Sequence, residues 1–114
     1  MKGKENMAKA LVKRQVPLRT YEITYLIGGG ATSSELAAMR DEVVALVGKF
    51  TGKIQDTQDW GKKSLAYPIS SEGETHTEAY YTYLVVEMAA DKVVKFTKEL
   101  QLKKGIIRDL VVAV

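Results

Sequence analysis

The spacing of apolar residues along this 114-residue chain alternates between two periods, and this alternation constrains the fold more than any other feature. From residue 21 to 27 every second position is Tyr or Ile, which is typical of a strand. Three glycines at 28–30 break this segment, and Thr32, Ser33 or Ser34 can cap a helix that follows. Apolar residues then recur every three or four positions and form one stripe of that helix: Leu36, Met39, Val43, Leu46, Val47 and Phe50.

The second half of the chain repeats the change of period. An extended segment at 53–69 is interrupted near Gly61, where we expect a bulge, and the polar residues 70–77 predict a loop. A strand at 78–88, a helix at 91–102 and a strand at 106–114 follow. The order β-α-β-β-α-β predicts an α+β ferredoxin-like sandwich, with four antiparallel strands, two helices on one face and the other face open. We expect residues 19–114 to form this domain and residues 1–18 to form a basic, flexible N-terminal arm.

The composition of the chain excludes several classes of function. The chain has no cysteine, which excludes disulfides, thiol catalysis and cysteine-based metal sites. It has one histidine, His76, which we expect to be an exposed loop residue, because one imidazole makes neither a metal site nor a catalytic triad alone. No apolar run approaches the roughly 20 residues that span a bilayer, so we expect no membrane partner and a cytoplasmic location. We expect no catalytic residue, metal or cofactor.

Positive charge is concentrated at the N-terminus. Residues 1–20 contain six of the 17 basic residues and one of the 14 acidic residues, a net charge of +5. The other 11 basic and 13 acidic residues leave a net charge of −2 on the rest of the chain. Such an arm suits phosphate contact, but a solvated tail and an organelle transit peptide are alternatives.

The glycine triplet at 28–30 invites comparison with phosphate-binding loops, because it lies between a strand and a helix N-terminus. It lacks the following Lys-Ser/Thr pair of one such motif and the glycine spacing of the other. We therefore expect a simple turn.

Two features suggest a binding surface. If Leu84 and Val86 face the helices, Tyr81 and Tyr83 face outward, where tyrosines can stack on bases, fill a protein interface or pack on neighbouring strands. Lys62 and Lys63 are adjacent on a strand and project to opposite faces, unless a bulge turns both toward a phosphate backbone. A charged edge strand that prevents aggregation explains these lysines equally well.

The segment Trp60-Gly61-Lys62-Lys63-Ser64-Leu65-Ala66-Tyr67-Pro68-Ile69 resembles bacterial small-subunit ribosomal protein six. Tyr21-Glu22-Ile23, Val86-Glu87-Met88 and Ile107-Arg108 lie at matching distances from it, and the resemblance covers residues 19–114. It implies a ferredoxin-like fold, no enzymatic activity and a structural place in the small ribosomal subunit. The implied partners are small-subunit ribosomal RNA and small-subunit ribosomal protein eighteen, bound as a heterodimer by a protein that is monomeric when free.

The resemblance also assigns candidate residues. Those expected to contact RNA are basic or aromatic: Arg19, Tyr21, Lys62, Lys63 and Arg108. Lys103 and Lys104, just before the last strand, are expected to add phosphate contacts. Those expected at the partner-protein interface are Tyr67, Tyr81, Tyr83 and Val85. The long basic arm, and the end of the sequence at Val114 without a charged tail, depart from the family pattern. Bacterial and organellar ribosomes both remain open.

Two rivals share the predicted fold. An acylphosphatase requires a catalytic asparagine, and the only asparagine is Asn6 in the arm, so the chemistry of the site argues against this enzyme. A regulatory module that binds a small molecule and forms a homodimer through the open sheet face would explain the outward tyrosines as well as a ribosomal protein does.

Overall fold

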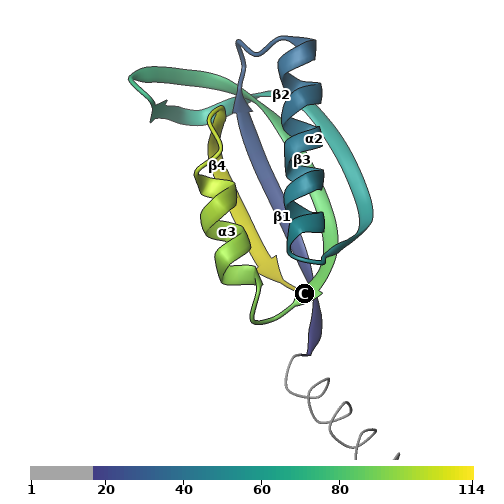
Figure 1. Cartoon of the computed structure of the whole chain (residues 1–114). Helices are drawn as coiled ribbons and strands as arrows, with labels where there is room; N and C mark the ends of the chain where they lie inside the picture. Colours follow the sequence, from purple (N-terminus) through teal and green to yellow (C-terminus); the bar gives the residue numbers. More distant parts are fainter. Residues whose placement is uncertain (1–16) are drawn as a thin grey trace, which may run out of the picture.

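The chain folds into a four-stranded antiparallel sheet covered by two helices (Figure 1). The computed structural model describes residues 17–114. Its elements follow the order β1 (Leu18–Gly28), α2 (Ser33–Lys49), β2 (Lys53–Ser71), β3 (Glu74–Ala89), α3 (Val93–Gln101) and β4 (Ile106–Ala113). The strands are arranged β2-β3-β1-β4, so β1 and β3 are central. The predicted β-α-β-β-α-β order and fold class are confirmed.

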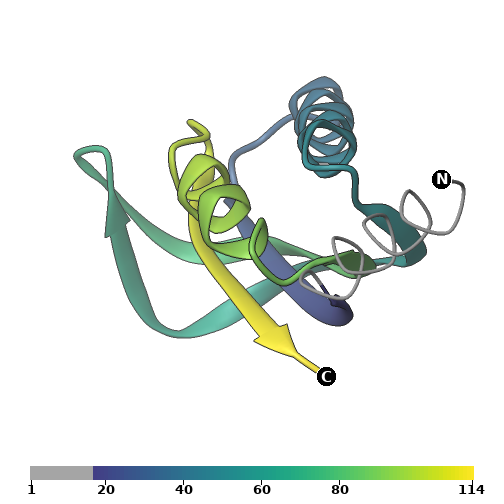
Figure 2. The same ribbon diagram turned by 60° about the horizontal axis from the view of Figure 1, so that its bottom comes forward.

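The core lies between the sheet and the helices, which share one face (Figure 2). Because side chains alternate along a strand, every second residue of β1 and β3 points to the helices. These residues pack against the apolar stripes of α2 and α3, and the fully buried members include Ile23, Tyr25, Leu84, Val43, Phe96 and Leu100. Burial raises the pKa of Tyr25, whose hydroxyl is hydrogen-bonded to Thr82 on the neighbouring strand. The predicted apolar stripe of α2 is confirmed.

Both ends of α2 are capped. The Thr32 hydroxyl accepts a hydrogen bond from the backbone N–H of Glu35 at 3.2 Å, and the Glu35 carboxylate accepts one from the N–H of Thr32 at 3.0 Å. This reciprocal pair is a capping box. At the other end the N–H of Gly52 donates to the carbonyl of Val47, and Thr51 adopts a left-handed φ of 55°. The helix thus ends in a Schellman motif with threonine at the position that glycine usually fills.

The predicted loop at 70–77 is wrong. β2 continues to Ser71 and β3 begins at Glu74, so these residues form the tip of a long hairpin. Glu72 and Gly73 both have positive φ, 52° and 79°, as a two-residue hairpin turn with the native twist requires. The flanking residues are polar because little of this tip is buried, and their polarity conceals the strands in the sequence.

The N-terminal boundary lies slightly earlier than expected. Leu18 pairs with Ala89 in the sheet, and the Pro17 carbonyl accepts a hydrogen bond from Ala90. β1 therefore includes the last residue assigned to the arm. Residues 1–16 of the predicted basic arm lie outside the described residues. Neither helix of residues 17–114 has the length and apolarity needed to cross a membrane.

Candidate functional site

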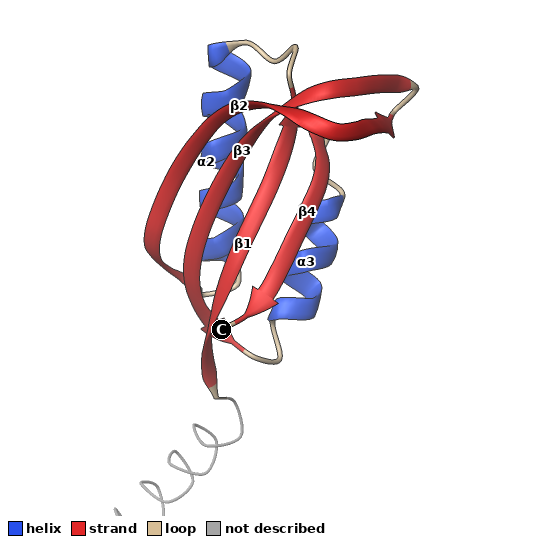
Figure 3. Cartoon of the chain, turned by 180° about the vertical axis from the view of Figure 1, so that it is seen from behind, coloured by secondary structure: helices blue, strands red, loops and turns tan. Residues whose placement is uncertain are grey.

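Figure 3 shows the sheet from the face that points away from both helices, here called the open face. Paired residues of neighbouring strands form rows of side chains across this face. The rows are Lys63 and Ala79; then Gly61, Tyr81, Leu26 and Arg108; then Gln58, Tyr83, Thr24 and Leu110; then Asp56, Val85, Glu22 and Val112. We call the rows of Lys63 and Arg108 the cationic end, and the row of Asp56 and Glu22 the acidic end. The open face is therefore polarised, with an aromatic and apolar band between the two ends.

Lys62 and Lys63 lie on opposite faces of the sheet. A bulge at Trp60 does interrupt β2 as predicted, and Gly61 has a φ of 74° there. After it, however, Lys62 pairs with Tyr80 and Lys63 with Ala79. The Lys62 ammonium lies 5.8 Å from the centre of the Tyr80 ring on the helix side, whereas Lys63 lies 5.6 Å from Trp60 and 5.8 Å from Tyr81 on the open face. Of this pair, only Lys63 belongs to the open face.

Trp60 is part of the open face, although the sequence did not single it out as a site residue. Its indole stacks on the Tyr83 ring with centres 5.1 Å apart and planes 11° apart. The indole N–H donates to the Gln58 amide oxygen at 2.9 Å, and 42% of the residue remains exposed. The sequence feature that could have indicated this role is its position next to the predicted bulge, because a bulge residue can turn toward either face.

Tyr81, Tyr83 and Val85 all lie on the open face, where the alternation of β3 predicts them. Each is only half-buried. Desolvation and a hydrogen bond to the Glu22 carboxylate raise the pKa of Tyr83. Leu110 and Val112 on β4 extend this apolar band and are exposed, which the alternation of the last strand could also have indicated.

The segment Leu65-Ala66-Tyr67-Pro68 leaves the β2–β3 ladder. Ser64 pairs with Glu78 and Ile69 with His76, so five steps along β2 correspond to two along β3. The extra residues make the hairpin bend toward the β4 side of the sheet (Figure 3). Tyr67 lies on this bend and is 71% exposed, while Leu65 packs against the buried cluster of Leu26, Ile69 and Ala79.

The remaining predicted RNA contacts do not form one cluster. Arg108 is exposed on the open face beside Leu26, and Lys103 and Lys104 lie in the turn that precedes β4 at the same end of the sheet. Arg19 is exposed seven residues before Leu26, or about 23 Å along the strand. Tyr21 is only 6% exposed, because odd residues of β1 point to the helices. The assignment of Tyr21 to RNA is therefore corrected to a core position.

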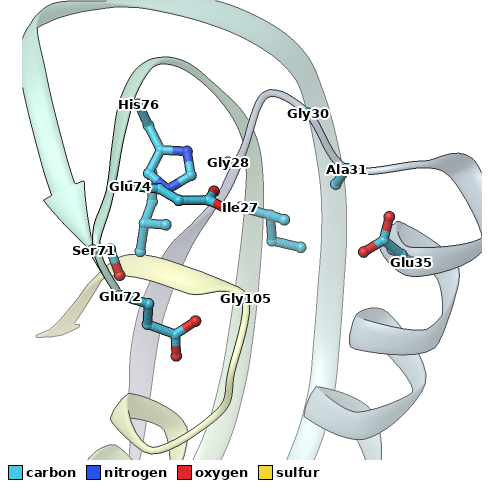
Figure 4. Close-up of a pocket in the computed structure, with 11 residues that line it drawn as sticks. Ile27, Gly28, Gly30, Ala31, Glu35, Ser71, Glu72, Glu74, His76 and Gly105 are labelled. Carbon is cyan, nitrogen blue, oxygen red and sulfur yellow. The ribbon is translucent and has the colours of Figure 1, made fainter.

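A cavity of about 380 Å³ lies elsewhere, at the tip of the hairpin (Figure 4). Glu72, Glu74 and His76 of the hairpin and Glu35 of α2 line it, so its charge does not suit a phosphate. A Cβ on Gly28 would meet the His76 ring at 2.5 Å, which shows that the glycine permits close approach of the hairpin. Within residues 17–114, no three His, Cys, Asp or Glu side chains are grouped to hold a metal ion.

Comparison with known proteins agrees with this architecture. The family model of ribosomal protein S6 matches residues 20–113. The small ribosomal subunit protein bS6 of Vesicomyosocius okutanii is 28% identical over 84% of this chain and 80% of its own length. That of Thermus thermophilus is 24% identical over 83% of this chain and 90% of its own length. In three dimensions, 30S ribosomal protein S6 of Thermotoga maritima matches with a TM-score of 0.77 and 19% identity, covering 86% of this chain and 89% of its own. The chain therefore belongs to the ribosomal protein S6 family.

Proposed function

We propose that this chain is a structural constituent of the small ribosomal subunit and binds small-subunit ribosomal RNA together with small-subunit ribosomal protein eighteen. Membership of the S6 family supports the ribosomal role. The observation that carries the binding role is the polarised open face, since helices cover only the opposite side of the sheet. Exposed aromatic and aliphatic side chains in such number are typical of a surface that receives a partner.

The two ends of the open face suit two different partners. At the cationic end Lys63 and Arg108 can neutralise phosphates, which provides affinity irrespective of base sequence. At the acidic end Asp56 and Glu22 flank Val85 and Val112, which suits a protein that presents apolar and basic side chains. We assign RNA to the first end and protein eighteen to the second. No bond is made or broken in this role.

RNA binding can be tested by the salt dependence of affinity. We expect the double variant Lys63→Ala/Arg108→Ala to bind a small-subunit RNA fragment more weakly in a gel-shift titration. Its plot of log affinity against log salt concentration should be shallower by about two, roughly one for each lost phosphate contact. Both side chains are exposed, so the variant should fold normally.

The matched control is Lys95→Ala/Lys98→Ala, which removes two exposed cations from α3 on the other side of the molecule. This control should retain the wild-type slope. An equal loss in both double variants would mean that net charge, and not the open face, determines binding. Two results would contradict the proposed function. One is RNA binding that does not depend on salt, and the other is absence of RNA binding both with and without protein eighteen.

A further inference from the structure

A small recess lies between the open face and the bent hairpin, at the cationic end. It is lined by the apolar side chains of Leu26, Leu65 and Ile69, by Tyr67 and Tyr81, and by Arg108. Its volume is about 170 Å³. It exists because the four unpaired residues of β2 carry Leu65 and Tyr67 over the sheet, and because Leu26 and Ile69 are buried beneath them. We propose that this recess receives a single unstacked base of single-stranded RNA, a proposal that rests on the RNA-binding function above.

Size and shape favour one flat ring system. Cavities that enclose drug-sized ligands usually measure about 300–1,000 Å³, so this recess is small and suits one base better than a whole nucleotide. Aliphatic side chains and two tyrosines line it, which is the environment in which proteins bind splayed-out RNA bases. Backbone groups of the bulge lie outside the ladder register and can hydrogen-bond the edge of a base.

The rings that line the recess are available for stacking. Trp60 and Tyr83 already stack on each other, so a base would have to separate them to enter between them. Among residues 17–114, Tyr67 takes part in no such ring pair, and it is one of the most exposed large side chains. A base that stacks on Tyr67 therefore displaces solvent and breaks no existing aromatic contact.

Charge distinguishes a base from an apolar side chain of a protein partner. Arg108 lies at the edge of the recess, and the Lys63 ammonium is 5.8 Å from the centre of the Tyr81 ring. Glu22 and Asp56, the acidic side chains of the four rows, lie two rows away. Lys63 and Arg108 thus place positive charge beside the recess, which favours a ligand that carries phosphate. A leucine would fill the recess but gain nothing from these cations, and a phenylalanine would gain only a cation–π contact with them.

The experiment compares the full chain with three variants by fluorescence anisotropy. The probes are eight-nucleotide single-stranded RNAs of uniform base, one for each base, and an RNA duplex of the same length. Tyr67→Leu removes the stacking ring, Tyr67→Phe keeps it, and Lys98→Ala is the control on α3. We expect wild type to prefer a single strand to the duplex, and Tyr67→Leu to weaken single-strand binding about tenfold with no effect on the duplex. Tyr67→Phe and Lys98→Ala should resemble wild type.

A second measurement locates the base directly. An RNA that carries 5-iodouridine should cross-link to Tyr67 or Tyr81 under ultraviolet light. Mass spectrometry then identifies the cross-linked residue. Equal single-strand affinity of wild type and Tyr67→Leu, with cross-links elsewhere, would overturn the recess but leave the proposed function intact. Loss of binding to protein eighteen alone in Tyr67→Leu would show a protein occupant. Failure of the wild-type chain to bind any RNA, both alone and with protein eighteen, would contradict both proposals.

Discussion

At the scale of single residues, the face of the sheet on which a side chain lies determines whether it can contact a partner. Lys62 and Lys63 are neighbours in the sequence, yet their ammonium groups lie over Tyr80 on one face and Tyr81 on the other. The sequence predicted both the bulge at Gly61 and the two outcomes for these lysines. The sequence could not show whether the two lysines share a face, because the face that a residue occupies after a bulge depends on its cross-strand register. Tyr21 was misplaced for a similar reason, since a motif position does not specify which face a strand residue occupies.

The contact between Gly28 and His76 gives a prediction at the scale of one residue pair. We expect Gly28→Ala to lower the free energy of unfolding by about 1–3 kcal/mol, because the new methyl group would overlap the imidazole. The double variant Gly28→Ala/His76→Ala should recover part of this loss, because the obstructing ring is absent. Urea unfolding of the two single variants and the double variant measures the coupling. Strictly additive effects would show that His76 is not what limits this position.

At the scale of elements, the sequence predicted best where one face of an element is buried. The alternation along β3 and the stripe of α2 gave the correct faces, because burial of an apolar face produces the periodicity itself. The tip of the β2–β3 hairpin was missed, since it buries little and therefore has no such pattern. The recess was missed as well, because it requires an irregular bend that brings Tyr67 over Leu26.

The start of α2 gives a prediction of pH dependence. Hydrogen bonding with the backbone N–H and the side chain of Thr32 lowers the pKa of Glu35 below its ordinary value of 4.5. A lowered folded-state pKa means that the carboxylate stabilises the fold above pH 4.5 and loses this effect as the pH falls through the folded-state pKa. We therefore expect Glu35→Gln to be less stable than wild type at pH 7, with the difference disappearing in acid. Urea unfolding at several pH values tests this.

The control for this prediction is Glu42→Gln, the same substitution in the same helix but away from its N-terminus. It should show a smaller difference at pH 7, because it has no place in the capping box. If both variants lose the same stability, general helix charge explains the effect and the capping box does not.

At the scale of the whole molecule, the two layers separate stability from binding. Apolar residues that stabilise the fold lie between the sheet and the helices, whereas the residues proposed to bind partners lie on the open face. Surface substitutions on the open face should therefore change binding with little effect on folding. The ribosomal role and the rival homodimer would both use the open face. One substitution on this face therefore affects either complex, and the mass of the complex tells which of the two forms.

The mass of the protein in solution separates these two roles. We expect light scattering to give a monomer for the chain alone and a one-to-one complex with small-subunit protein eighteen. Val85→Lys, which places a charge in the apolar row at the acidic end of the open face, should remain a folded monomer and fail to form the complex. Val44→Lys, at an exposed position on α2, is the matched control and should bind as wild type does. A wild-type homodimer that Val85→Lys dissociates would instead identify the open face as a self-association surface, because a second copy would then occupy the place proposed for protein eighteen.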